Sequence, residues 1–322
     1  MRMLKSSSTL FIIVTAGLQL LSIINIAAAS NHIHRIDYSH ATISAIREII
    51  TDVKQGAAKT LYNHMEPKEK RCYVCITYAQ TIDGCIGIST ENESEIASSS
   101  NLSLSSSDSF LLTHALRANF DAILVGGNTL STDNPRLNNR LWNDHDNQPD
   151  TDEPTLKQPI PVILDSNLRH IISMVQSNQI IKCAKSHDFI IICCHESAYE
   201  EWHEKIREYC SLHNVSIKLQ VCDCCEGIKR LQLKQLLQRL GKNYGIDSVM
   251  VEGGASVISS FLSQHSDLVD CVCVTICPRF VGRKGLNALQ SASIRGSTGE
   301  VMLEFGANKW FQLGQDSIFL GS

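Results

Sequence analysis

Hydrophobic residues gather in short continuous runs along the chain, and stretches with a helical pattern separate these runs. The runs are "CYVCITYA", "DAILVGG", "IPVILDS", "FIIICC", "VSIKLQVC", "SVMVEGG" and "DCVCVTICP". Helices are predicted between them at about residues 108–119, 197–211, 231–242 and 255–265. Continuous apolar strands that alternate with helices are typical of a parallel sheet covered on both faces. The pattern therefore predicts an α/β fold with a mostly parallel central sheet and helices on both faces.

A further helix is predicted over residues 39–63, ahead of the first strand. Its apolar residues at three- and four-residue spacing are Ile43, Ile46, Ile49, Ile50 and Val53. Two polar segments, "SEIASSSNLSLSSSDS" and "NDHDNQPDTDEPTLKQP", interrupt the later strands, but neither divides the chain convincingly. We expect a helical extension over residues 31–70 and one catalytic domain over residues 71–322.

The N-terminus, residues 1–30, has the pattern of a secretory signal. Arg2 and Lys5 precede an apolar stretch that ends in small residues. The stretch is nearly long enough to span a bilayer, so an uncleaved membrane anchor is the alternative. We predict a targeting segment and expect membrane contact only through it.

Composition narrows the class of partner. The chain has 322 residues, of which 43% are hydrophobic, so it can bury a full core. Its net charge is −4 and no basic patch is interleaved with aromatic residues, which argues against nucleic acid as a partner. A small-molecule ligand is expected instead.

The chain has 13 cysteines, several of them inside the strand-like runs. An odd number in such positions indicates packed thiols in a reducing space. The cluster "CDCC" at 222–225 has no second pair at a zinc-site spacing, so no metal site is expected. Passage through the secretory route to an organelle such as a plastid would reconcile these thiols with a signal. Without a functional signal, a cytoplasmic location is expected.

Polar side chains follow the strand in "DAILVGGNTLSTDNPRLNNR". The double glycine lets a ligand approach the backbone closely. Thr129 and Asp133 offer hydrogen bonds, and Arg136 and Arg140 suit a phosphate. The alternative is a turn with solvent-facing arginines.

A second strand with a glycine-rich end is "SVMVEGGASVISSFL", which places Glu252 just ahead of a double glycine and a helix start. Free amides and the helix dipole favour an anion there. The segment "ITYAQTIDGCIG" presents Asp83 in what is otherwise an ordinary Asp-Gly turn. The usual dinucleotide fingerprint, a nucleophile elbow and a zinc-deaminase module are all missing from the sequence.

Together these segments resemble the pyrimidine reductases of riboflavin biosynthesis, which are relatives of dihydrofolate reductase in fold. The segments "TYAQTIDG", "LLTHALRANFDAILVGGNTLSTDNPRLNNR", "QPIPVILDSNLR" and "VMVEGGASVISSFL" follow the family's order between about residues 73 and 282. The likeness is closest to the fungal-type, stand-alone branch. That branch reduces 2,5-diamino-6-ribosylamino-4(3H)-pyrimidinone 5′-phosphate with NADPH, and its members are commonly homodimers.

The resemblance also implies roles for individual residues. The implied NADPH contacts are Ala79, Thr129, Asp133, Gly253, Gly254, Ala255 and Ser256. The implied substrate contacts are Arg117, Leu137, Arg140 and Glu252. Hydride transfer to C1′ of the opened sugar needs proton handling, for which Glu252, Asp83 and Asp133 are the candidate groups.

The sequence departs from the family at Cys85, where many members have a lysine or arginine. If that cation binds substrate, Arg136 is the candidate replacement. The alternatives are the related 5-amino-6-(5-phosphoribosylamino)uracil reductase, a non-catalytic nucleotide-binding relative, and a membrane-tethered interaction protein built on the N-terminal segment.

Overall fold

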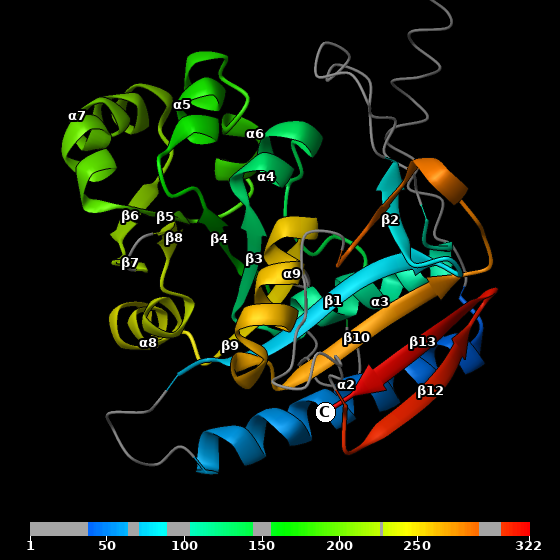
Figure 1. Ribbon diagram of the computed structural model, residues 1–322. Coiled ribbons are helices and arrows are strands. Elements are labelled where there is room, and N and C mark those ends of the chain that lie inside the picture. Colours follow the sequence, from blue (N-terminus) through cyan, green and yellow to red (C-terminus); the bar gives the residue numbers. More distant parts are fainter. Residues whose placement is uncertain (1–37, 64–70, 89–103, 144–155, 226–227, 290–303) are drawn as a thin grey trace, which may run out of the picture. The chain divides into compact units, whose positions relative to one another are not determined.

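The apolar runs form the inner strands of one large sheet in the computed structural model, which describes residues 38–63, 71–88, 104–143, 156–225, 228–289 and 304–322 (Figure 1). Residues His40–Ser322 form one compact unit. The sheet has nine strands within the described residues, in the order β12-β13-β10-β1-β9-β3-β4-β5-β6. From one edge to the other these are Asn308–Leu313, Asp316–Gly321, Cys271–Cys277, Tyr73–Thr81, Ser248–Gly253, Ala122–Gly126, Ile160–Leu164, Ile190–Cys194 and Ile217–Val221.

The seven strands from β10 to β6 run parallel, and they are the seven runs predicted from the sequence. The predicted α/β fold with a mostly parallel sheet is therefore confirmed. The antiparallel hairpin β12–β13 at one edge was not predicted. Two small antiparallel pairs, β2 (Cys85–Ile88) with β11 (Gly285–Asn287) and β7 (Cys224–Cys225) with β8 (Ile228–Leu231), were also missed.

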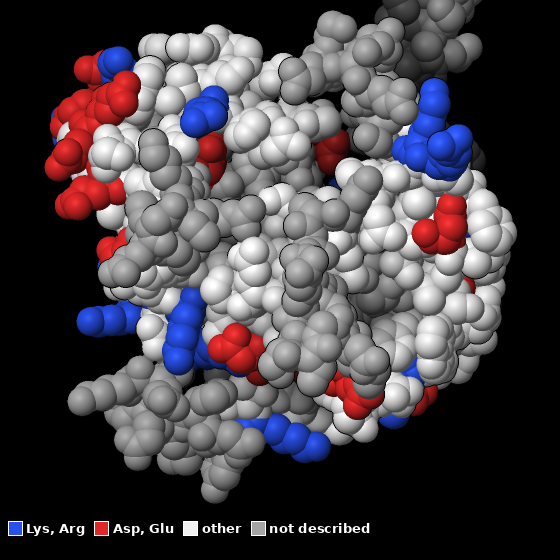
Figure 2. Space-filling model, viewed as in Figure 1, with Lys and Arg blue, Asp and Glu red and all other residues white. Residues whose placement is uncertain are grey.

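Helices cover both faces of the sheet. The helices are α2 (His40–Asn63), α3 (Ser107–Asn119), α4 (Gly127–Asp133), α5 (Arg169–Gln176), α6 (Ile181–Ala184), α7 (Glu196–His213), α8 (Leu233–Tyr244) and α9 (Ala255–Gln264), with short 3₁₀ turns at η3 (Ser266–Leu268) and η4 (Gly282–Lys284). On the face of the molecule shown in Figure 2, acidic side chains gather over α7. Within the described ranges, no helix is both long enough and apolar enough to cross a membrane. The predicted targeting segment lies outside these ranges.

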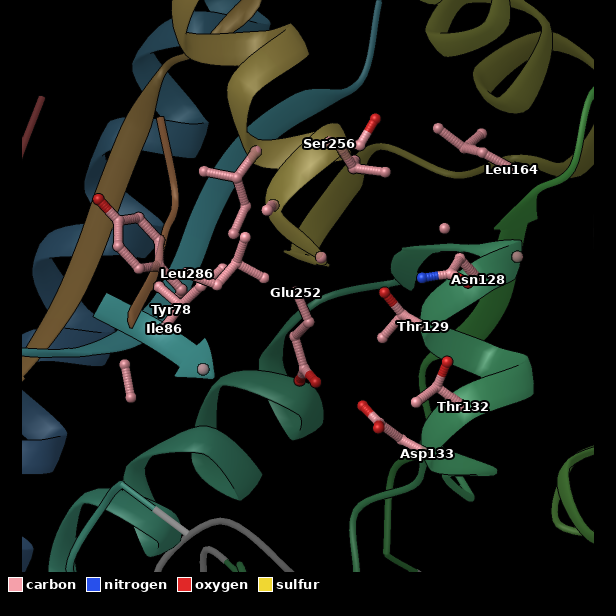
Figure 3. A pocket seen from close by; sticks show the side chains of 18 of the residues that line it. Tyr78, Ile86, Asn128, Thr129, Thr132, Asp133, Leu164, Glu252, Ser256 and Leu286 are labelled. Carbon is pink, nitrogen blue, oxygen red and sulfur yellow. The ribbon is translucent and has the colours of Figure 1, made fainter. Parts of the chain in front are cut away.

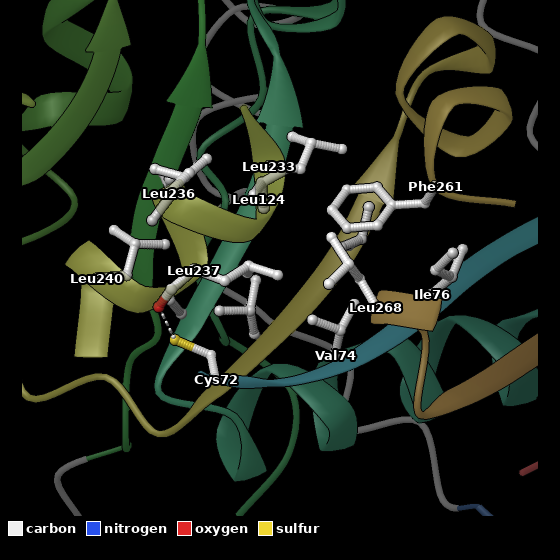
Figure 4. Close-up of a cluster of buried hydrophobic side chains, with 14 of the residues drawn as sticks. Cys72, Val74, Ile76, Leu124, Leu233, Leu236, Leu237, Leu240, Phe261 and Leu268 are labelled. Carbon is white, nitrogen blue, oxygen red and sulfur yellow. Dashed lines mark hydrogen bonds between the residues drawn. The ribbon is translucent and has the colours of Figure 1, made fainter. Parts of the chain in front are cut away.

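Successive residues of each strand contribute to opposite cores. Leu124 packs with α8 and α9 on one face, in the cluster that contains Leu236 and Phe261 (Figure 4). Its neighbours Ile123 and Val125 pack with α4, α5 and α7 on the other face. This two-residue period in a central strand requires an apolar side chain at every position, which explains the continuous runs in the sequence.

Every cysteine whose side chain is described is a free thiol, and all but Cys210 are buried. The thiol of Cys72 illustrates how they are packed, because its Sγ donates to the carbonyls of Leu237 and Ile246 at 3.0 Å each (Figure 4). Burial raises the pKa of Cys72 to about 12. Such thiols act as core side chains, in agreement with the sequence-based interpretation.

The helix α2 belongs to the same compact unit as the sheet and packs against α3, β1 and β12. Gly56 faces Tyr73 so closely that a Cβ at this glycine would lie 2.9 Å from the Tyr73 hydroxyl. The side chain of Thr42 donates to Asp108 Oδ1 at 2.8 Å. The helix of the predicted extension is thus part of the domain's own packing.

A buried ion pair joins the beginnings of β1 and β10. Both Arg71 nitrogens contact the carboxylate of Asp270, at 2.7 and 3.0 Å, and the side chains are only 8% and 10% exposed. The same carboxylate accepts the amide of Val74 at 2.8 Å. Removal of one partner from such a pair leaves a buried charge without compensation.

We therefore expect Arg71→Met to lower the free energy of unfolding by about 3 kcal/mol or more, because the Asp270 charge loses its counterion. Urea unfolding measures this change. The matched control is Lys309→Met, which removes an exposed pair with Asp52 and is expected to change stability by less than about 1 kcal/mol. Equal effects of the two substitutions would contradict the assignment of Arg71 to the core.

Candidate active site

A cavity of about 1050 Å³ opens at the carboxyl ends of β1, β3, β4 and β9. Most of its lining comes from residues within 77–79, 126–133, 164–170 and 252–258 and from the β2–β11 pair, and residues 104–105, Phe110, Thr113 and Thr275 complete it. Ligands of α/β proteins bind at this end of a parallel sheet, because the turns into the following helices lie there. Of the residues for which the resemblance implied ligand contacts, Gly253 does not line the cavity, and those that do are Ala79, Thr129, Asp133, Glu252, Gly254, Ala255 and Ser256.

The turn between β9 and α9 has a backbone that only glycine adopts readily. Gly253 has φ of 63° and Gly254 has φ of 94°, and a Cβ at Gly254 would overlap Thr129. The hydroxyl of Thr129 donates to the carbonyl of Gly253 at 3.1 Å, which joins this turn to the one between β3 and α4. The helix α9 starts here without a side-chain cap, so its first amides are available to an anion in the cavity.

Glu252 reaches into the same cavity from the end of β9 (Figure 3). Its carboxylate is paired with Arg117 of α3. Arg117 Nε and Nη2 each donate to one carboxylate oxygen at 2.7 Å. Burial alone lowers the pKa of Arg117, but the charge and hydrogen bonds of Glu252 outweigh it, and the pKa is raised. Arg117 is therefore a fixed cation behind the cavity wall and does not itself line the wall.

Asp133 lies on α4 across the cavity from Glu252, and both carboxyl groups point into the space between them (Figure 3). Within the described part of the chain, no hydrogen bond to the Asp133 side chain is found. Partial burial raises the pKa of Asp133. The two carboxyl groups thus differ in their surroundings, because one is ion-paired and the other lacks a counterion.

The structure gives Asp83 a different position from the one proposed for proton handling. Its carboxylate accepts the hydroxyl of Thr81 and the amides of Gly282 and Val281, the latter two at 2.8 and 3.2 Å. The Thr81 hydroxyl and then the Gly282 amide hold the pKa of Asp83 down at about 2. Asp83 does not line the cavity, and a carboxylate held this firmly in its charged form is a poor proton donor. Its contacts instead fix the turn that carries β2.

Cys85 also points away from the cavity. Its side chain packs against Gly285 of β11, where a Cβ would overlap the sulfur. The pair of β2 and β11 presents Ile86, Ile88 and Leu286 to the cavity instead. A lysine or arginine at position 85 would not fit against Gly285. The small cysteine that stands here therefore suits the close packing of β2 against β11.

The segment Asn134–Trp142 covers one side of α3. Leu137 has a left-handed backbone, with φ of 55°, and its side chain is buried in the core rather than in the cavity. Arg140 lies at the surface, with its amide donating to His114 Nδ1 at 3.1 Å and its guanidinium 5.4 Å from the Phe110 ring centroid. Phe110 lines the cavity. Of the implied substrate residues, Glu252 lines the cavity, and Arg117, Leu137 and Arg140 surround it.

Sequence reasoning missed the residues that follow β4. Asp165, Ser166, Asn167, Arg169 and His170 all line the cavity. The buried carboxylate of Asp165 accepts the Ile171 amide at 2.9 Å at the start of α5 and packs against Gly127, where a Cβ would lie 3.0 Å from Asp165 Cβ. The signal was present in "IPVILDSNLRH", because polar residues directly after a buried parallel strand lie at the ligand end of the sheet. Among the described residues, no cluster of His, Cys, Asp and Glu has the arrangement of a metal site.

Comparison with known proteins places the chain in a family. Residues 72–319 match the family of the RibD C-terminal domain. The chain is 30% identical over 267 residues to the 2,5-diamino-6-ribosylamino-4(3H)-pyrimidinone 5′-phosphate reductase of Schizosaccharomyces pombe, which covers 80% of this chain and 90% of the relative.

Two solved structures show the same fold. The riboflavin biosynthesis reductase Rib7 of Saccharomyces cerevisiae superposes with a TM-score of 0.51 at 22% identity, over 78% of this chain and 89% of Rib7. The RibD protein of Acinetobacter baumannii superposes with a TM-score of 0.57 at 21% identity, over 78% of this chain and 58% of RibD. The shared fold accords with the dihydrofolate-reductase-like architecture expected from the sequence.

The buried His114 predicts a pH dependence of stability. Burial first, and then the charges of Arg117 and Arg140, lower the pKa of His114 from 6.5 to about 3. Between these pH values the unfolded chain binds a proton that the folded chain does not, so stability falls as the pH drops below 6.5. The expected loss from this residue is about 1.4 kcal/mol for each pH unit.

His114→Asn removes the titrating group and keeps an acceptor at the position of Nδ1. The difference in unfolding free energy between wild type and this variant should therefore shrink by about 2 kcal/mol between pH 6.5 and pH 5. Urea unfolding at the two pH values tests this, since groups common to both proteins cancel. Parallel pH curves would show that His114 titrates normally in the folded state.

Proposed function

The chain belongs to the family of the RibD C-terminal domain, and we propose on this premise that it is an NADPH-dependent oxidoreductase of riboflavin biosynthesis. The proposed reaction reduces the ribosyl side chain of 2,5-diamino-6-ribosylamino-4(3H)-pyrimidinone 5′-phosphate to the ribityl form. One observation carries the proposal. A single cavity is lined at one side by a glycine turn suited to a cofactor anion and at another by an arginine-paired carboxylate suited to a polar substrate.

The residues at the β9–α9 turn fit a nicotinamide dinucleotide. Gly253 and Gly254 let this turn pack directly against Ile258 and Thr129, and the first amides of α9 can bind the oxygens of a pyrophosphate in the cavity. Ala79 and Thr129 line the adjoining wall. When bound, the cofactor supplies a hydride from C4 of its nicotinamide ring.

The side chains at the start of α5 favour NADPH over NADH because one of them is an arginine. Arg169 and His170 line the cavity at the start of α5, and the His170 ring is oriented by a 3.1 Å contact between its Nδ1 and Ser131 Oγ. A 2′-phosphate requires such a cation, whereas a free 2′-hydroxyl is usually bound by a carboxylate. Arg169 is exposed, so its guanidinium is available for paired hydrogen bonds to a phosphate.

The opposite end of the cavity suits the sugar phosphate. Arg117 contacts the segment that carries Arg136 and Arg140 through the Asn138 carbonyl. Burial first, and then the charges of Arg117 and Arg136, lower the pKa of Arg140. Glu252 balances one of them. The remaining positive charge matches a phosphate monoester, which carries nearly two negative charges at neutral pH.

Asp133 is the proposed group for proton transfer. In the reaction, the C1′–O4′ bond of the ribosylamine breaks and leaves an imine, C1′ then receives the hydride, and O4′ and the nitrogen end up protonated. Its carboxyl group faces the cavity opposite Glu252, and desolvation raises its pKa above that of an ordinary aspartate, which favours a role in proton transfer. Glu252, fixed by Arg117, would orient the polar substrate and stabilise positive charge at the imine.

The decisive experiment is an assay of NADPH oxidation with the diaminopyrimidinone ribosyl phosphate and, separately, with its deaminated uracil counterpart, using protein that lacks residues 1–30. Turnover of the first substrate supports the proposal. Turnover of the second alone would assign the uracil reductase activity instead. Binding of NADPH without turnover of either substrate would identify a non-catalytic relative.

Glu252→Gln should lower kcat/KM roughly a hundredfold, because a neutral amide loses the bidentate ion pair and a misplaced contact group costs about that much. The control Glu208→Gln changes an exposed carboxylate on α7 and should leave the rate unchanged. Circular dichroism checks that both variants fold. Wild-type rates in Glu252→Gln would contradict its role.

Arg169→Ala should raise KM for NADPH about tenfold, the factor that corresponds to one lost charge-assisted hydrogen bond of about 1.5 kcal/mol. KM for NADH should not change, since NADH has no 2′-phosphate. Arg207→Ala, on the surface of α7, is the matched control. An equal loss with both cofactors would show that Arg169 does not read the phosphate.

We also propose that residues 1–30 are a targeting segment and that the protein is a homodimer. Sequencing of the mature N-terminus tests the first proposal, and the molecular mass in solution tests the second.

A further inference from the structure

One face of α3 contacts the segment Asn134–Trp142 at three points. Arg117 Nη1 donates to the Asn138 carbonyl at 3.0 Å. One turn earlier, His114 Nδ1 accepts the backbone amide of Arg140 at 3.1 Å. One further turn back, the Phe110 ring lies 5.4 Å from the Arg140 guanidinium carbon. Residues three and four apart share a helix face, so this spacing brings the three side chains to one segment.

The backbone that leads to Arg140 is held in a strained conformation. Leu137 adopts a left-handed φ of 55° although it is not glycine, and such residues persist only where the surroundings fix them. Asn139 is fixed next to it, because its amide and carbonyl both bond the side chain of Gln158 at 2.8 Å. Arg140 therefore follows a rigid backbone, and its charged side chain reaches the surface, as that of Arg136 also does.

Few contacts of its own hold the Arg140 side chain. Burial first, and then the charges of Arg117 and Arg136, lower its pKa, whereas the charge of Glu252 raises it, and its hydrogen bond to Asn138 Oδ1 is long, at 3.4 Å. An exposed arginine also has many rotamers to choose from. The Phe110 ring offers a cation–π contact, and its edge-on packing against His114, with centroids 4.9 Å apart, holds the ring in place.

His114 suits the role of an acceptor. It is completely buried, and its pKa is lowered to about 3 by burial and by the neighbouring arginines. The imidazole therefore stays neutral at physiological pH, which leaves Nδ1 free to accept the Arg140 amide. A protonated ring would donate from both nitrogens and would repel this amide.

We propose that Phe110 and His114 are positioning residues that fix Arg140, by its guanidinium and by its backbone, to bind the 5′-phosphate of a sugar-phosphate substrate. This inference rests on the proposed function for the identity of the substrate. In this proposal, the face of α3 that carries Arg117 also positions the arginine that binds the substrate phosphate. One helix face would thus set both the carboxylate that contacts the substrate and the arginine that binds its phosphate.

The test uses binding of ribose 5-phosphate, measured by calorimetry, with ribose as the unphosphorylated comparison. His114→Leu, which removes the acceptor, should weaken binding of ribose 5-phosphate roughly tenfold. His114→Asn, which places an acceptor near Nδ1, should restore most of it. Phe110→Leu should weaken binding roughly threefold to fivefold and Phe110→Trp should not, because a larger aromatic face keeps the cation–π contact.

The matched control is Trp202→Leu, which removes a cation–π contact with Lys205 at 4.2 Å on α7 and should leave binding unchanged. In turnover of the phosphorylated substrate, the His114→Leu and Phe110→Leu effects should appear in KM, with kcat nearly constant. Equal losses for ribose and ribose 5-phosphate, or no difference between the Leu and Asn variants, would overturn the inference.

This outcome is separable from a failure of the proposed function. If wild type binds ribose 5-phosphate but reduces neither pyrimidine, the proposed reaction fails and the variants still test the positioning of Arg140. If wild type does not bind ribose 5-phosphate in preference to ribose, the inference itself is wrong, whatever the protein reduces.

Discussion

The ion pair between Arg117 and Glu252 is the contact on which the arrangement of the site depends. Glu252 lies at the end of β9, between β1 and β3 in the sheet, where a carboxylate without a counterion would be strongly disfavoured. Two hydrogen bonds of 2.7 Å from Arg117 balance that charge and fix the position of both oxygens. Since Arg117 also donates to the Asn138 carbonyl, the same guanidinium joins the sheet, α3 and the segment that carries Arg140.

The second constraint is the close approach of two strand-to-helix turns. The β3–α4 and β9–α9 turns belong to adjacent parallel strands and meet where Thr129 bonds the Gly253 carbonyl. A side chain at Gly253 or Gly254 would overlap Ile258 or Thr129 respectively, and a Cβ at Gly126 would lie 3.1 Å from the Val257 side chain. The glycines therefore serve the packing between the turns as well as access for a ligand. This explains why two separate glycine pairs stand in for the single glycine-rich fingerprint of ordinary dinucleotide folds.

The sequence predicted the parts of the fold that depend on burial. Strands such as "SVMVEGG" are apolar at every position because both faces are covered, and that pattern is visible in the chain itself. The hairpin β12–β13 was missed because "NKWFQL" is largely exposed at the sheet edge, so no hydrophobic pattern marks it. The pair of β2 and β11 joins residues about 200 positions apart, and such a pairing has no local signal.

The sequence pattern also marks some residues of the candidate site and leaves others unmarked. Glu252 and the double glycine stood out because a carboxylate at the end of an apolar strand is unusual. His114 did not stand out, because a histidine in a helix is usually an ordinary core residue. Its role depends on the hydrogen bond that the Arg140 amide donates to Nδ1, which only the structure shows. Arg169 was passed over because its charge is unremarkable in the sequence, and only the course of β4 brings it to the cavity.

Carboxylates show most clearly why residue type alone cannot assign a role. Asp83, Asp133, Asp165 and Glu252 all lie at or beyond the carboxyl ends of strands, and residue type alone does not separate their roles. Asp83 accepts two backbone amides and a hydroxyl, and Asp165 accepts the amide of Ile171 at the start of α5. Glu252 is neutralised by an arginine. Asp133 alone among these four has neither a described hydrogen-bond donor nor a counterion, while its partial burial raises the pKa. Among the described residues, Asp133 therefore brings to the cavity a carboxyl group that no neighbouring donor or cation holds.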